Sequence, residues 1–178
     1  LDKLKNLSSE NLNVIFGFEE LSRSKMNSTS IVVIEKINTK NICNKFGKIY
    51  DKMCNGGLLI LDTTNILLHR IELAGILMYN GLEIISTSST FDDNYIIIKK
   101  TYEKSIIKSP SVNFIIKLDR VGYKGRNIKI HKFRSMYKYS EFLHQNMLKG
   151  NDLSTIGKIE SDPRVTKLGR FMRKYWLD

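Results

Sequence analysis

A basic segment leads directly into a carboxylate at the end of this chain. The last fifteen residues run Arg164-Val-Thr-Lys-Leu-Gly-Arg-Phe-Met-Arg-Lys-Tyr-Trp-Leu-Asp178. The spacing of their apolar residues predicts an amphipathic helix whose other face carries arginine and lysine. Arginine donates in a planar, bidentate geometry that suits phosphate. A carboxylate beside such charges is kept ionised, as a nucleophile must be. The plain alternative is a helix with a solvated basic face.

A second basic segment, Ile130–Met136, precedes it. On a strand, Lys132 and Arg134 share one face, and His131 and Phe133 share the other. Two cations on one face beside a turn could hold a diphosphate, although an exposed strand with solvated charges has the same pattern. The three histidines and two cysteines of the chain lack the spacing of metal ligands, so we predict no zinc site.

Alternating strand and helix signals fill the first hundred residues and predict an α/β fold. Two short β-branched or leucine-rich runs are typical of buried strands, and each is followed by a helical apolar period. A polar turn then separates two further apolar runs, which predicts a closing hairpin. This order predicts a Rossmann-like, partly parallel sheet. The expected elements are strand 31–34, a helix capped by Thr39 and running through Met53, strand 58–61, helix 67–79, and strands 82–86 and 95–100.

The remaining residues predict a small α+β part. A hairpin is expected over 114–118 and 127–133, a helix over 137–148, and a last helix over 167–174 with Thr166 as its N-cap. Residues 101–178 hold 17 Lys/Arg against 7 Asp/Glu, whereas residues 1–100 hold 12 against 11. The change in charge places the expected domain boundary between residues 105 and 106, giving domains 1–105 and 106–178. The basic half is suited to phosphate, nucleic acid or anionic lipid.

Cysteine and hydropathy patterns bear on location. Cys43 and Cys54 are expected on one helix, roughly 16 Å apart, which is too far for a disulfide. Free thiols fit a reducing compartment. No apolar run approaches the roughly 20 residues of a spanning helix, so we expect this fragment itself to be soluble.

Four ordered segments resemble the bacterial sugar transferase family, the polyprenyl-phosphate sugar-1-phosphate transferases that begin capsule, O-antigen and exopolysaccharide assembly. They are Arg120-Val-Gly-x-x-Gly125, Lys129-Ile-x-Lys-Phe-Arg-Ser-Met136, Asp162-Pro-Arg-Val-Thr-Lys-Leu-Gly-Arg-Phe-Met-Arg173 and Leu177-Asp178. In that family the last motif continues Asp-Glu-Leu-Pro. Asp178 therefore matches the first acid of a catalytic pair, and we expect the fragment to be truncated there and inactive alone. Residues 31–100 also weakly resemble the C-terminal half of a Rossmann-like methyltransferase domain.

The first resemblance implies a two-step phosphotransfer. Asp178 would attack the sugar-proximal phosphate of a UDP-sugar, and polyprenyl phosphate would then take the phosphosugar from the covalent intermediate. Lys132, Arg134, Arg164 and Arg173 match basic positions of the family, and we expect them to contact phosphate or to shape the site. Mg²⁺ is the implied cofactor, with Asp178 as a ligand. The implied location is peripheral, on the cytoplasmic face of the inner membrane.

One departure concerns the route to the lipid. Typical members carry a hydrophobic membrane helix before the Arg-Val-Gly turn, but Tyr95–Leu118 is too charged for that role.

The predicted activity is initiation of surface polysaccharide synthesis, and the alternative is a basic nucleic-acid-binding module. A third possibility is a ligand-binding methyltransferase-like first domain, although no glycine-rich loop marks a site there. The sugar and the oligomeric state do not follow from the sequence.

Overall fold

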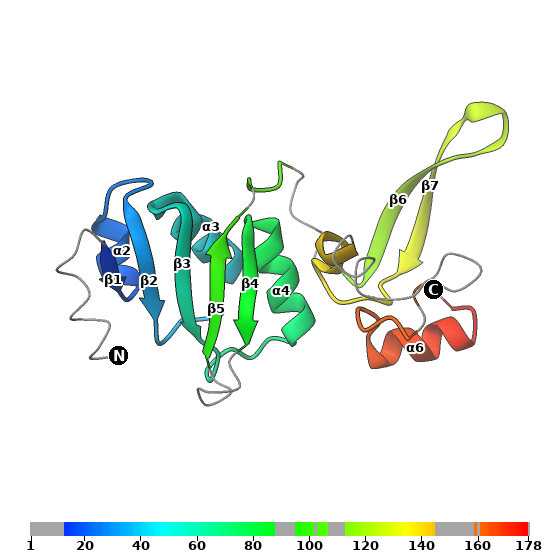
Figure 1. The fold of residues 1–178 in the computed structure, drawn as a ribbon. Coiled ribbons are helices and arrows are strands. Elements are labelled where there is room, and N and C mark those ends of the chain that lie inside the picture. The colour runs from blue at the N-terminus through cyan, green and yellow to red at the C-terminus, as the bar shows by residue number, and fades with distance from the viewer. Residues whose placement is uncertain are drawn as a thin grey trace. The chain divides into compact units, whose positions relative to one another are not determined.

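The computed structural model describes residues 13–87, 95–101, 103–106, 113–144, 159 and 161–177. The chain divides into two compact units, Leu1–Ile106 and Ile107–Asp178. This division lies one residue from the expected boundary. The assignment of the two units as a Rossmann-like domain and the first part of a catalytic domain stays a prediction. Figure 1 shows the elements of each unit.

A five-stranded mixed sheet forms the first unit. Its strand order is β1-β2-β3-β5-β4. The pairs β1–β2 and β2–β3 are parallel, and β5 pairs antiparallel with both β3 and β4. The predicted fold, a partly parallel sheet closed by a hairpin, is therefore confirmed. The strands are β1 (Val14–Phe16), β2 (Thr29–Ile34), β3 (Met53–Asp62), β4 (Leu82–Thr87) and β5 (Tyr95–Lys100).

Three helices connect the parallel strands and the hairpin: α2 (Phe18–Arg23), α3 (Ile42–Lys52) and α4 (Arg70–Tyr79). α2 contacts α3, and α3 contacts α4; in Figure 1, α3 lies behind the sheet. Val32 on β2, Leu59 on β3 and Ile98 on β5 stand in register and are fully buried. Phe46 and Ile49 of α3 are buried as well. Each such side chain contributes about 1.5–3 kcal/mol when it leaves water.

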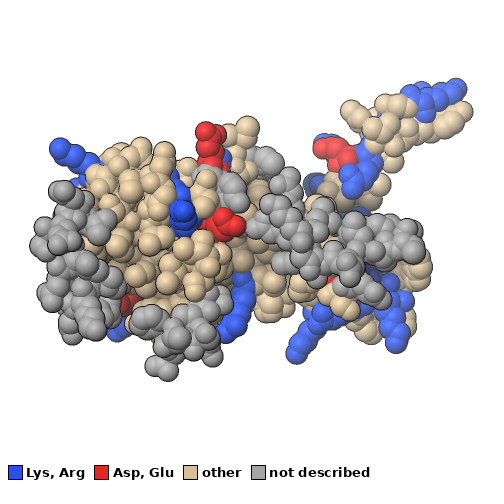
Figure 2. Space-filling model, in the orientation of Figure 1, with Lys and Arg blue, Asp and Glu red and all other residues tan. Residues whose placement is uncertain are grey.

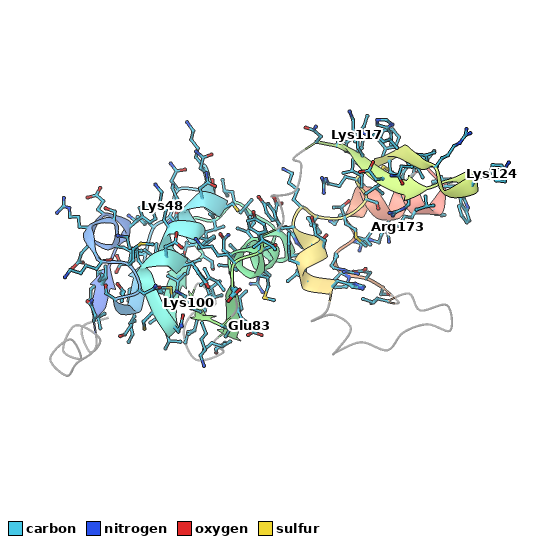
Figure 3. The ribbon with its side chains drawn as sticks, turned by 90° about the horizontal axis from the view of Figure 1, so that it is seen from above. Lys48, Glu83, Lys100, Lys117, Lys124 and Arg173 are labelled. Carbon is cyan, nitrogen blue, oxygen red and sulfur yellow. The ribbon has the colours of Figure 1, made fainter. Side chains whose placement is uncertain are left out.

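Lys100 is buried at the end of β5, in the interior of this unit. Only 6% of the residue is exposed, and its Nζ donates to the carbonyls of Tyr50 (3.0 Å) and Met53 (2.7 Å) and to Asn27 Oδ1 (3.0 Å). Burial lowers the pKa of Lys100, against the charge of Asp51, which acts to raise it. The ammonium group satisfies carbonyls at the C-terminal end of α3, where a positive charge is favourable. Figure 3 labels this residue.

Two expectations for α3 are wrong. Asn41, not Thr39, is its N-cap, and Met53 is the first residue of β3 rather than a helical residue. Gly56 and Gly57 lie in a break in the β2–β3 register, where a Cβ on Gly57 would meet Cys54 O at 2.9 Å. Cys54 consequently lies on the strand, so the two cysteines do not share a helix, although both are free.

The second unit combines a hairpin with one helix. β6 (Ile115–Val121) pairs antiparallel with β7 (Asn127–Phe133), and the short 3₁₀ turn η2 (Tyr123–Gly125) joins them. α6 spans Lys167–Lys174, as predicted. The helix expected over 137–148 is instead a 3₁₀ turn, η3 (Ser140–Leu143), and residues 145–148 lie outside the described residues. Tyr139 in a left-handed conformation (φ 61°) begins that turn and interrupts the helical pattern.

No helix in the described part of the chain is both long enough and apolar enough to span a bilayer.

Candidate active site

α6 is seated directly on the segment that follows the hairpin. Thr166 caps the helix by accepting from the Gly169 amide (2.8 Å), and its own amide donates to Ser135 O (3.0 Å). A Cβ built on Gly169 would lie 1.8 Å from Ser135 O. Only glycine permits this approach, because the obstructing atom belongs to the backbone. The Thr-x-x-Gly pattern at the start of the helix is thus both a cap and a packing contact.

A short antiparallel contact continues the connection. Met136 forms a bridge with Val165, and the Tyr137 amide donates to Arg164 O (2.9 Å). The residues after β7 and the residues before α6 are therefore held side by side. Two basic motifs that are separated by some thirty residues of sequence meet here at the backbone level.

Arg164 is buried in a closed ion pair. Its Nε donates to Asp162 Oδ1 (2.9 Å) and its Nη2 to Asp162 Oδ2 (2.7 Å), and both side chains are at most 10% exposed. Its Nη1 donates to His144 Nδ1 (3.1 Å). Burial would raise the pKa of Asp162, but hydrogen bonds and charge from Arg164, with a smaller contribution from Arg173, outweigh it and lower the pKa. The pair holds the backbone before α6, because the Arg164 amide also donates to Asp162 Oδ1 (2.9 Å); the role of Arg164 in the site stays a prediction.

Arg134 directly precedes Ser135 in the chain, and Arg173 contacts Ser135 from α6. The Arg134 amide donates to Phe114 O (2.7 Å) and its Nε to Asn113 O (3.2 Å), which places this side chain at the base of the hairpin. The exposed Arg173 on α6 donates from Nε to Ser135 Oγ (3.2 Å). Figure 2 shows Lys and Arg side chains around α6 and at the hairpin tip, and Figure 3 labels Arg173. Contact of either residue with phosphate stays a prediction.

Lys132 opens onto a hollow between the hairpin and the end of α6. The hollow has a volume of about 210 Å³. Lys132 is half-buried, and it has no ion-pair partner among the residues that the structure describes. We name this space the hairpin–helix hollow; its lining is Ile115, His131, Lys132, Phe133, Trp176 and Leu177. It combines a cation with an indole and an imidazole, and its last lining residue directly precedes Asp178 in the chain.

The end of α6 is a Schellman cap built without glycine. The Leu177 amide donates to Met172 O (2.9 Å), and the Trp176 amide donates to Arg173 O (3.4 Å). Trp176 occupies the left-handed position (φ 57°), where glycine is usual, while its side chain is 92% exposed. The cap turns the chain sharply after the helix, so Leu177 lies against the hollow.

Asp178, expected as nucleophile and metal ligand, lies outside the described residues. Within them, no group of three or more His, Cys, Asp or Glu side chains could hold a metal ion. The carboxylate of Asp162 is already engaged by Arg164, and Lys132 is cationic. The described residues of the site do not by themselves fit Mg²⁺, which prefers several oxygen ligands.

Sequence reasoning missed Ser135, Gly169 and Trp176 as parts of the site. Gly169 carried a signal, since a glycine inside an amphipathic helix is costly unless close packing requires it. The left-handed Trp176 carried none, because tryptophan gives no indication of that conformation.

Residues 95–178 match the family described as bacterial sugar transferase. The recognition made from the four motifs is thereby confirmed for this part of the chain.

Several characterised proteins are similar to a stretch of about 65 residues. The chain is 40% identical over 65 residues to the galactosyl transferase CpsE of Streptococcus agalactiae, covering 36% of this chain and 14% of that protein. It is 37% identical over 65 residues to the UDP-galactose-lipid carrier transferase of Erwinia amylovora (34% and 14%). It is 36% identical over 64 residues to the undecaprenyl-phosphate galactose phosphotransferase of Salmonella typhimurium (33% and 13%). The match thus spans about a seventh of these relatives.

A solved structure, the 16S rRNA N2 G1207 methyltransferase RsmC of T. thermophilus with AdoMet and guanosine, aligns with a TM-score of 0.33 and 11% identity. The alignment covers 72% of this chain and 35% of that one.

Proposed function

We propose that the protein transfers a sugar-1-phosphate from a UDP-sugar to polyprenyl phosphate at the cytoplasmic face of the inner membrane, and so initiates surface polysaccharide synthesis. The observation that carries the proposal is the hairpin–helix hollow. A half-buried lysine lines it, and the residue after its last lining residue is the acid of the family motif. The names of the relatives, which mention UDP-galactose and undecaprenyl phosphate, support the substrate classes.

In the first step an Asp178 carboxylate oxygen attacks the sugar-proximal phosphorus of the UDP-sugar. The bond from that phosphorus to the bridging oxygen breaks, and UMP leaves with the electron pair. In the second step a phosphate oxygen of polyprenyl phosphate attacks the same phosphorus and releases the carboxylate. Each step conserves charge and needs no redox partner.

The chain's own residues would contribute charge and orientation. The ammonium of Lys132 would contact the diphosphate, where a charge-assisted hydrogen bond contributes about 1.5–3 kcal/mol. Arg173 and Lys174 in the last turn of α6 oppose the negative end of the helix dipole, which would otherwise disfavour a carboxylate just beyond it. Arg164 would act indirectly, by fixing the segment before α6. Mg²⁺ remains part of the proposal and would supply neutralisation of diphosphate charge.

UMP release tests the proposal on the full-length protein, with a panel of UDP-sugars, undecaprenyl phosphate and Mg²⁺. Asp178→Asn should abolish release, and Lys132→Ala should slow it at least tenfold. The matched control is Lys129→Ala, an exposed residue of β7 that does not line the hollow. EDTA should stop the reaction if Mg²⁺ takes part. Absence of release with every sugar from a folded protein would refute the proposal, and tight, salt-sensitive binding of RNA or DNA would then favour the nucleic-acid alternative.

A further inference from the structure

The first unit gathers positive charge at one edge of its sheet. β1, β2 and β3 are parallel, so their carboxyl ends lie together, followed by the loops that lead into α2, α3 and α4. Between Glu35 and Asp51 the chain has four lysines and no acidic residue. Residues 1–100 are otherwise almost balanced, with 12 basic and 11 acidic side chains. The loops that follow these parallel strands therefore form a basic edge of the first unit.

Two hollows open at this edge. The first, with a volume of about 370 Å³, lies at the start of α3 and is lined by Lys40, Lys45 and Lys48 together with Phe18, Asn38, Asn41 and Asn44. The second, of about 460 Å³, is lined by Lys36, Ile37, Asn38, Thr39 and Asn65. Asn38 lines both, so they adjoin. Their volumes fall within the range of small-molecule sites, roughly 300–1,000 Å³.

The charges in these hollows are not neutralised within the described structure. Lys36, Lys40 and Lys48 form no ion pair with a described residue, and Lys45 Nζ donates only to the carbonyl of Asn38 (2.7 Å). Neither lining includes a carboxylate. Asp62, at the end of β3, accepts from Thr64, and Glu35 at the end of β2 is exposed outside both linings.

The start of α3 adds to the same field. No acidic residue occupies its first turn, and the N-cap Asn41, in a left-handed conformation, makes no side-chain cap hydrogen bond. The positive end of the helix therefore faces the lysine-lined hollow without an internal anion. Figure 3 labels Lys48 on this helix.

We propose that this edge of the first unit binds a phosphate-bearing small molecule of mononucleotide size. The lysines would contact the phosphate, and the asparagine amides with the Phe18 ring would contact the remainder of the ligand. A hollow lined by amides suits a small ligand better than a bilayer, since a membrane-binding face needs exposed apolar side chains, whereas Ile37 is buried and Phe18 half-buried. Its lining residues all belong to the first unit, and the proposal does not rest on the proposed transferase function.

The test is an NMR titration of the chain with inorganic phosphate, AMP and UMP in parallel. Amide signals of Asn38, Asn41 and Asn44 should shift at sub-millimolar nucleotide, with inorganic phosphate weaker. The double substitution Lys40→Ala and Lys48→Ala should weaken binding at least tenfold. The matched control, Lys25→Ala with Lys99→Ala, removes the same charge from exposed positions outside both linings and should change affinity less than twofold.

Three outcomes would overturn the proposal. They are the absence of shifts at these amides up to millimolar ligand, an equal loss of affinity in the control pair, and shifts caused by RNA or by anionic vesicles but by no small phosphate. UMP binding at the transferase site would shift signals of Lys132 and Leu177 instead, so the two sites are distinguished in one spectrum.

Discussion

Substituting Gly169 by alanine should destabilise the second unit strongly, although alanine is the better helix former. The new Cβ would lie 1.8 Å from Ser135 O and 2.6 Å from Ser135 C. Ordinary contacts of carbon lie near 3.5 Å, so α6 must withdraw by more than about 1 Å. The obstructing atoms are backbone, and no side-chain rotation relieves the overlap.

The expected loss of unfolding free energy follows from the contacts that are broken when α6 moves away from Ser135. Overpacking costs about 1–3 kcal/mol. Thr166 donates two hydrogen bonds to Ser135 O, from its amide (3.0 Å) and from its hydroxyl (3.3 Å). Losing each of them costs about 1 kcal/mol. The higher helix propensity of alanine offsets about 1 kcal/mol of this destabilisation. The net expectation is a loss of about 2–4 kcal/mol, a large part of the stability of a small domain.

Urea unfolding followed by the NMR amide signals of α6 measures this loss. These amides belong to the second unit, so their signals report on that unit rather than on the first. The control is Lys167→Ala, which changes an exposed residue of the same helix and should shift the midpoint little. A Gly169→Ala midpoint equal to or above that of the control would show that α6 does not rest on Ser135, and the geometry of the site described above would be wrong.

Three further predictions concern stability. The Asp162 pKa is lowered in the folded state, so the ionised carboxylate stabilises the fold above the unfolded value of about 3.9, and this stabilisation is lost as pH falls through the folded pKa. Asp162→Asn should therefore lower the urea midpoint at pH 7 and lower it much less at pH 2. An equal loss at both pH values would contradict the ion pair with Arg164. Trp176→Gly should stabilise the second unit by about 0.5–1 kcal/mol by circular dichroism, because glycine accepts the left-handed conformation, whereas Trp176→Ala should give no gain. Lys100→Met should destabilise the first unit by about 2–4 kcal/mol because it leaves buried carbonyls unpaired, while Lys99→Met, on the exposed neighbour, should cost under about 0.5 kcal/mol in thermal melts.

Local signals in the sequence predicted some elements to the residue. The alternation over 127–133 and the Thr166 cap before 167–174 agree with β7 and α6. Both rest on interactions within a few positions of the chain. The start of α3 was missed because Asn38 and Asn41 form the local turn instead of Thr39, with the Lys40 amide donating to Asn38 Oδ1 (2.8 Å).

The site was predictable in its residue types but not in its contacts. Motif order identified Lys132, Arg134, Arg164 and Arg173 as a group. It could not show that Arg164 is buried in an ion pair with Asp162. That pair is held by contacts distant in sequence, namely Arg164 with His144 and the strand-like bridge between Val165 and Met136. Likewise, the approach of Gly169 to Ser135 joins residues 34 positions apart, beyond the reach of any local pattern.

The position of β5 limits where this protein can be divided. The match to the transferase family begins at residue 95, which is the first residue of β5. Yet β5 lies between β3 and β4 in the sheet. It ends in Lys100, whose ammonium group donates to the carbonyls of Tyr50 and Met53 at the C-terminal end of α3. A gene fusion or truncation joined at residue 95 would remove an interior strand and leave β4 without a neighbour, whereas a junction near residue 107 would leave the sheet complete. Exchange of the amino-terminal unit between related proteins would therefore succeed only if residues 95–106, the first twelve of the family-matching region, were exchanged together with the sheet and not left with the transferase motifs.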